Sequence, residues 1–76
     1  MNEKLEQRTR DVVRKLNNVK IECEDLMKDI NENIENEEVN FDNLYYAERI
    51  IDSMIRNLDD CKRDVVYLED EVDEEE

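Results

Sequence analysis

The sequence contains neither glycine nor proline. Tight β-hairpin turns depend on these residues, because glycine adopts positive φ without steric cost and proline fixes φ at turn positions. Their absence argues against a fold of short strands joined by tight turns. The chain is instead rich in Glu, Asp, Lys, Arg, Leu and Ile, with 46% charged residues, a composition typical of long helices. We therefore predict an all-α fold.

Histidine is absent as well, which removes the commonest general base and a common metal ligand. Phosphate-binding loops and EF-hand loops need glycine, and the di-iron sites of helical bundles need Glu-x-x-His pairs. The many carboxylates fall mostly outside the apolar stripes described below, as expected for solvated helix faces. We predict no catalytic residue, no metal site, no cofactor and no enzymatic activity.

Basic residues are few: 11 Lys and Arg stand against 24 Asp and Glu, and the net charge is −13. Contacts to phosphates and to anionic lipids need Lys and Arg, so we expect no direct binding to nucleic acid or to membranes. No apolar run is long enough to span a bilayer. The first ten residues, MNEKLEQRTR, lack the apolar core of a signal peptide. We predict a cytoplasmic protein.

Two cysteines, Cys23 and Cys61, lack CxxC spacing and have no histidine with which to share a metal. We interpret both as small buried hydrophobic residues. In an antiparallel hairpin they lie at different levels, so we expect no disulfide between them within one chain.

Apolar residues recur in two stretches, with gaps that alternate between four and three residues. This spacing is that of the heptad stripe by which helices pack in coiled coils. The first stripe is Leu5, Thr9, Val12, Leu16, Val19, Cys23, Leu26 and Ile30, and the second is Leu44, Ala47, Ile51, Met54, Leu58, Cys61, Val65, Leu68 and Val72.

The second stretch carries more apolar and aromatic surface than one neighbouring helix can cover. Such a surplus usually marks an interface, and a chain of 76 residues is too short for a large core of its own. We predict a homo-oligomer, with a dimer forming a four-helix bundle as the first hypothesis. The predicted interface residues are Tyr45, Tyr46, Ile50, Ile55, Val66 and Tyr67.

The polar segment 31–43, NENIENEEVNFDN, separates the two stripes. Asn40 suits a helix N-cap, and Val39 with Leu44 has the spacing of a hydrophobic staple. We predict one helical domain over 1–76: an antiparallel, coiled-coil-like hairpin. Its parts are a helix over 3–34, a turn over 35–40, a helix over 41–72 and a frayed acidic tail over 73–76.

An alternative remains open at this point. Counting heptads straight through the polar segment places Asn33, Glu37 and Asn40 before Leu44 without a break in register. One continuous helix of about 70 residues, roughly 105 Å long at 1.5 Å per residue, would keep this register in an antiparallel coiled coil.

Charge is divided between the two ends of the chain. Residues 1–20 hold six basic and three acidic residues, whereas residues 64–76 hold eight acidic residues and no basic one. Opposed blocks of charge favour an antiparallel arrangement, because a parallel in-register pairing sets like charges against each other.

We predict a non-catalytic protein that acts by binding another protein, with an accessory or inhibitory role. In size and composition the chain resembles phage accessory proteins and small proteins of low-GC bacteria, a resemblance that gives no residue a role. One alternative is capture of an anionic, nucleotide-like ligand between chains, since Arg forks onto phosphate and Tyr stacks on bases. The residues for it are Arg8, Arg10, Arg14, Tyr45, Tyr46, Arg49 and Arg56.

A second alternative is mimicry of nucleic acid. A rigid array of carboxylates imitates a phosphate backbone and fits a basic groove on a nucleic-acid-binding protein. The predicted acidic face is Glu22, Asp25, Asp29, Glu32 and Glu35.

Overall fold

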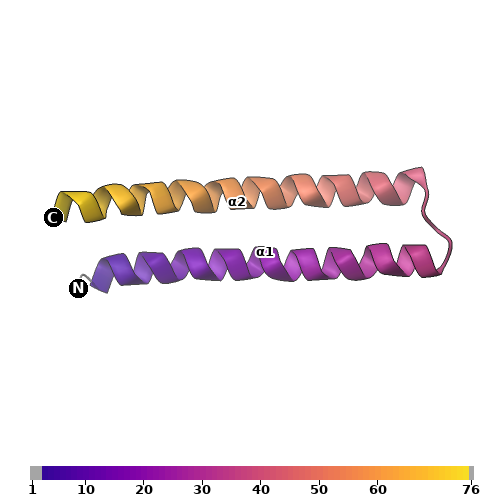
Figure 1. Ribbon diagram of the computed structural model, residues 1–76, viewed down its shortest axis with the longest axis horizontal. Coiled ribbons are helices and arrows are strands. Elements are labelled where there is room, and N and C mark those ends of the chain that lie inside the picture. The colour runs from indigo at the N-terminus through magenta and orange to yellow at the C-terminus, as the bar shows by residue number, and fades with distance from the viewer. Residues whose placement is uncertain (1–2, 76) are drawn as a thin grey trace.

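A computed structural model describes residues 3–75 of the chain. This part forms α1 (Glu3–Glu35) and α2 (Phe41–Glu75), which run antiparallel and lie side by side along their whole length (Figure 1). The molecule is a rod-like hairpin measuring 57 × 16 × 12 Å. The start of α1 and the end of α2 lie at the same end of the hairpin, opposite the turn (Figure 1). The all-α hairpin prediction is confirmed, and the continuous-helix alternative is wrong.

Backbone geometry ends α1 at the polar segment. The Glu38 N–H donates to the Asn33 carbonyl (2.7 Å) and the Glu37 N–H donates to the Ile34 carbonyl (3.2 Å). These two bonds form a Schellman cap, which needs one residue in the left-handed region. Glu37 takes that conformation with φ of 56°. The chain therefore leaves the helix axis here, and the heptad register that continues through the sequence has no structural counterpart.

Asn40 caps the start of α2, as the sequence predicts. Its side-chain oxygen accepts a hydrogen bond from the Asn43 N–H (2.9 Å), and its carbonyl accepts one from the Leu44 N–H (3.1 Å). The Asn43 side-chain amide donates to the Glu38 carbonyl (2.7 Å), so it ties the turn to the first helical turn. Val39 and Leu44 are both more than half exposed, and the predicted staple therefore adds little burial.

α2 continues to Glu75, three residues into the segment 73–76 that is predicted as a frayed tail. Glutamate has a high helix propensity, so the acidic end still continues the helix. Residue 76 lies outside the described residues.

The contact between the helices repeats every seven residues. Among the described residues, six hydrophobic side chains are buried: Val12, Val19 and Leu26 on α1, and Ala47, Met54 and Cys61 on α2. Val19, Leu26, Ala47 and Met54 form one cluster, against which Ile30 and Ile50 pack. A seven-residue interval returns a residue to nearly the same side of a helix. One neighbouring helix therefore covers one narrow line of side chains.

The opposed charge blocks meet across the helix pair, as predicted. Arg8 forms an ion pair with Glu71, and the Lys15 ammonium lies 2.6 Å from an Asp64 carboxylate oxygen. The basic beginning of α1 thus lies along the acidic end of α2. These two pairs link residues 8–15 of α1 to residues 64–71 of α2.

Candidate protein-interaction face

Half of each heptad stripe is left uncovered. Leu16 and Cys23 on α1 are exposed, as are Ile51, Leu58 and Val65 on α2. Each of them follows a buried residue by four positions. The prediction that both cysteines are buried is therefore wrong for Cys23, because its position in the heptad faces away from α2; Cys61 is buried.

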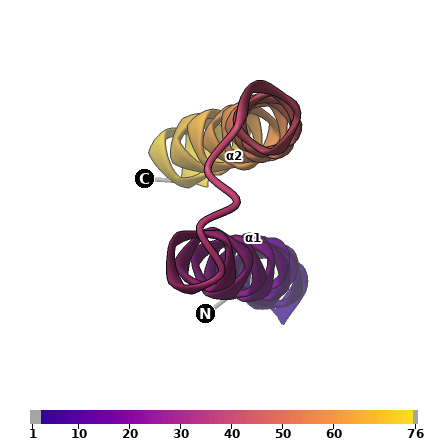
Figure 2. The ribbon, with the colours of Figure 1, turned by 90° about the vertical axis from the view of Figure 1, so that its right-hand side faces the viewer.

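These uncovered residues lie on one side of the hairpin. A helix turns by about 100° per residue, so a residue four positions further is displaced by about 40° from the buried line, in the same sense on both helices. Because the helices run antiparallel, equal displacements in the same sense point to the same side of the pair (Figure 2 views the helices end-on). We call this side the open face: Leu16, Cys23, Leu44, Ile51, Leu58, Val65 and Val72, with Val13, Met27, Ile34, Ile55 and Val66 at its edges.

A groove between the helices lies on the same side as Val65 and Val72 of the open face. At the end of the hairpin away from the turn, Thr9 and Val12 from α1 line one apolar groove together with Val65, Leu68 and Val72 from α2. Its walls are mainly apolar, and Glu69 and Asp73 stand at its rim. At this end of the hairpin, apolar side chains of both helices thus border one groove.

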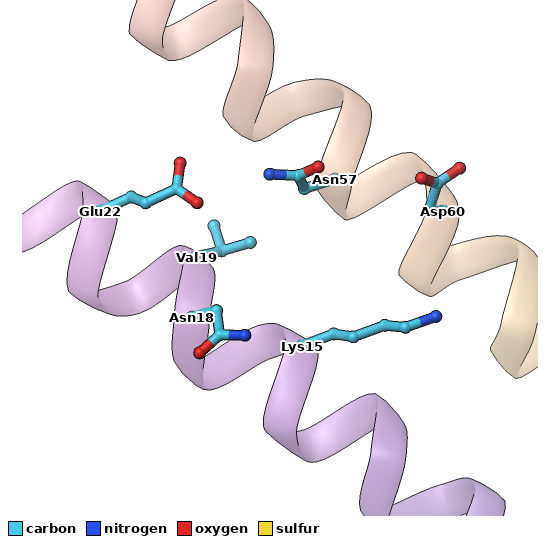
Figure 3. Close-up of a pocket in the computed structure, with 6 residues that line it drawn as sticks. All are labelled: Lys15, Asn18, Val19, Glu22, Asn57 and Asp60. Carbon is cyan, nitrogen blue, oxygen red and sulfur yellow. The ribbon is translucent and has the colours of Figure 1, made fainter.

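The opposite side of the hairpin is polar. Lys15, Asn18 and Glu22 on α1 face Asn57 and Asp60 on α2 across a hollow, with Val19 between them (Figure 3). Nearer the turn, the wall of a second hollow is formed by Glu22, Asp25, Leu26, Asp29, Tyr46 and Ile50. The hairpin therefore has one apolar face and one polar, largely acidic face.

The six residues predicted as an interface are not brought together. Ile50 packs against the hairpin's own core, and Tyr46 borders the polar side. Ile55 and Val66 are exposed at the edge of the open face. The other two tyrosines are also exposed, and Tyr45 stacks on Phe41 with ring centroids 6.0 Å apart.

Sequence reasoning missed the residues that do form the open face. The heptad stripe predicts Leu16, Ile51 and Leu58 at the contact between the two helices of one chain. The signal that could have identified them is the width of that stripe. Two helices alone cover one line of it, so the second position of each heptad remains for another neighbour.

The arginines proposed for an anionic ligand lie in two separate places. Arg8 pairs with Glu71 near the ends of the chain, Arg10 lies 3.8 Å from Glu6 and Arg14 lies 3.2 Å from Asp11.

Arg49 and Arg56 instead line a hollow on α2, nearer the turn, with Tyr45, Glu48 and Asp52. There the Arg49 guanidinium lies 5.8 Å from the Tyr45 ring centroid and donates to its hydroxyl (3.3 Å). The two carboxylates in this hollow oppose an anion. One chain therefore does not assemble the proposed ligand pocket.

The predicted acidic face forms one row on α1. Glu22, Asp25, Asp29, Glu32 and Glu35 follow each other at intervals of three or four residues within a continuous helix. This spacing keeps them on one side. Three of them border the hollow on the polar side, so the row faces away from the open face.

Asp64 perturbs the ionisation of Lys15. The hydrogen bond and the charge of Asp64 raise the pKa of the Lys15 ammonium above its ordinary value of 10.5. Lys15 and Asp64 both lie on the polar side. Their ion pair joins α1 to α2 and so stabilises the antiparallel pairing of the helices.

Within residues 3–75, no group of three or more His, Cys, Asp or Glu side chains is arranged to hold a metal ion. Neither α1 nor α2, over the residues described, is apolar enough along its length to cross a membrane. Comparison of the chain with known protein families, with curated proteins and with solved structures finds no match.

Proposed function

We propose that the protein is a non-catalytic interaction module that dimerises through the open face. Two hairpins then form a four-helix bundle and present their polar faces outward to a protein partner. The observation that carries this proposal is the division of the heptad stripe: Val12, Val19, Ala47, Met54 and Cys61 are buried within the hairpin, and the stripe residue four positions after each of them is exposed on a single face. Four-helix bundles cover both positions, because each helix has two neighbours.

The hairpin's own core is small for its length. Among the 73 described residues only six hydrophobic side chains are buried, and many large ones, Ile51 and Leu58 among them, are exposed. Burial of apolar surface contributes roughly 25 cal/mol per Å², and chains of this size usually need a further source of stability. A second copy that covers Leu16, Ile51 and Leu58 supplies it, with no change in the fold of either hairpin.

Sedimentation equilibrium tests the dimer. Wild-type protein is expected to sediment as a dimer at micromolar concentration, with a melting temperature that rises with concentration. Leu58→Glu should weaken dimerisation because it places a carboxylate on the open face. Asn57→Glu is the matched control, since it adds the same charge at the neighbouring position, which lies on the polar side. A folded wild-type monomer at tens of micromolar would contradict the proposal.

A second candidate function concerns the outward acidic row. Five carboxylates on one continuous helix, on the side left free by the dimer, suit the basic groove of a nucleic-acid-binding protein. A partner that binds this row should be displaced by duplex DNA and lost with the triple change Glu22→Gln, Asp25→Asn and Asp29→Asn. Binding that survives the triple change would remove this candidate.

A further inference from the structure

We infer that the polar side binds an arginine side chain of a protein partner, in the hollow that Glu22, Asp25 and Asp29 share with Tyr46. This inference rests on the second candidate function and deepens it, because it names the chemical group that a partner presents to the acidic row. The hollow lies between α1 and α2 on the side opposite the open face. A dimer that covers the open face therefore leaves the hollow accessible.

Two kinds of surface meet in this hollow. Its α1 wall carries three carboxylates, and its α2 wall carries the Tyr46 ring. The apolar part of the wall is Leu26, which is buried, and Ile50, which packs against the core of the hairpin. The volume is about 190 Å³, below the roughly 300–1,000 Å³ of pockets for small molecules. The hollow therefore suits a single side chain of a partner.

The three carboxylates of the hollow have no cation from their own chain. Among the described residues, none of the three takes part in an ion pair or a hydrogen bond. Elsewhere on the polar side the chain supplies the cation itself, since Lys15 pairs with Asp64 and Arg8 pairs with Glu71. Lys15 also lines the neighbouring hollow (Figure 3). A cation from a partner can take the corresponding place in the hollow nearer the turn.

Arginine matches both kinds of surface. Its planar guanidinium forks onto carboxylates and stacks on aromatic rings, and its aliphatic stem packs against apolar side chains. Lysine carries a compact, strongly hydrated ammonium that offers no planar fork. The chain itself contains an arginine over a tyrosine, because the Arg49 guanidinium lies 5.8 Å from the Tyr45 ring centroid. A basic segment with an arginine therefore fits the hollow better than one with a lysine.

Two small probes test the inference, N-acetyl-arginine amide and N-acetyl-lysine amide, which carry one cation each. Nuclear magnetic resonance follows the Tyr46 ring and the Asp25 and Asp29 amides during titration of the wild-type protein. Both probes should shift these signals, and the arginine probe should bind about two- to fivefold more tightly, the range of an exposed cation–π contact. Shifts that are strongest over the acidic residues 69–75 would overturn the inference.

Substitution of the ring separates the hollow from a plain acidic surface. Tyr46→Leu keeps an apolar side chain but removes the aromatic face, so it should abolish the preference for arginine over lysine. Tyr67→Leu is the matched control, because Tyr67 is as exposed as Tyr46, at 56%, and lies three heptads further along the same side of α2. It should keep the preference. A preference that survives Tyr46→Leu, or equal binding of the two probes to wild type, would overturn the inference and leave the acidic row as a candidate.

Neutralisation of the carboxylates tests the inference and the second candidate function together. One variant changes the hollow: Glu22→Gln, Asp25→Asn and Asp29→Asn. The control removes the same number of charges near the end of α2: Glu69→Gln, Asp70→Asn and Asp73→Asn. The first should weaken the arginine probe by about fivefold or more, since each exposed pair contributes about two- to fivefold, and the control by less than about twofold. Undiminished binding in the first variant would overturn both. Sedimentation of the same proteins reports separately on the dimer.

Discussion

The Lys15 ammonium lies 2.6 Å from an Asp64 carboxylate oxygen, and this ion pair joins residues 49 positions apart in the chain. Together with the Arg8–Glu71 pair, it holds the basic start of α1 against the acidic end of α2. The pair lies on the polar side, beside the buried line that runs through Val19. The ion pairs that favour the antiparallel orientation of the helices therefore lie on the polar side, opposite the open face.

The Lys15–Asp64 pair predicts a change of stability at alkaline pH. The folded-state pKa of Lys15 is raised above 10.5, chiefly by the hydrogen bond from Lys15 to Asp64. A group with a raised folded pKa contributes its full stability below the unfolded pKa and loses it as pH rises through the folded pKa. The difference in free energy of unfolding between wild type and Lys15→Met should be constant from pH 7 to about pH 10 and should shrink above it. Urea titrations at each pH measure this; Lys28→Met serves as control.

Removing the N-cap of α2 should destabilise the hairpin. Asn40→Ala leaves the Asn43 N–H without its side-chain acceptor, and loss of such a cap costs about 1 kcal/mol. Asn40→Asp keeps the acceptor and should retain most of the stability. Chemical denaturation of the three proteins provides the comparison. Equal loss in both variants would show that the side-chain oxygen is not what matters at this position.

The left-handed residue at the end of α1 should accept glycine with a gain. Glu37 has φ of 56°, a conformation that costs a residue with a side chain roughly 1–2 kcal/mol. Glu37→Gly should therefore raise the free energy of unfolding, by up to about 1 kcal/mol after the greater chain entropy of glycine is allowed for. Glu38→Gly, at the next position, should give no such gain. A destabilised Glu37→Gly variant would argue against the cap.

Two methionines allow the same substitution in buried and exposed positions. Met54 is 8% exposed and Met27 is 58% exposed. Met54→Ala should cost about 2 kcal/mol or more, because it leaves a cavity in the line of contact between the helices. Met27→Ala should change stability by less than about 0.5 kcal/mol when the protein is dilute enough to be monomeric. Thermal melts at low concentration check this contrast. At high concentration, a loss in Met27→Ala would add support for burial of the open face in a dimer.

Much of the fold could be predicted from local sequence patterns. Heptad spacing identified both helices, because side chains on one side of a helix recur every three or four residues. Asn40 marked the start of α2 through a bond made within three residues. The opposed charges of the two ends indicated an antiparallel pair. Heptad spacing and helix capping depend on residues a few positions apart. Attraction between opposed blocks of charge does not depend on how side chains pack.

The sequence could not predict which half of the heptad stripe is covered, because both halves are equally apolar. Val19 and Cys23 both belong to the stripe, yet the packing of α2 against α1 buries the first and exposes the second. The left-handed residue that ends α1 is a glutamate, Glu37, although this residue type does not favour the conformation, since the path of the chain into α2 selects the position. The sequence by itself determined two amphipathic helices and their direction. The tertiary structure decided which side of the pair is open, because one neighbouring helix covers one line of side chains and leaves the other exposed.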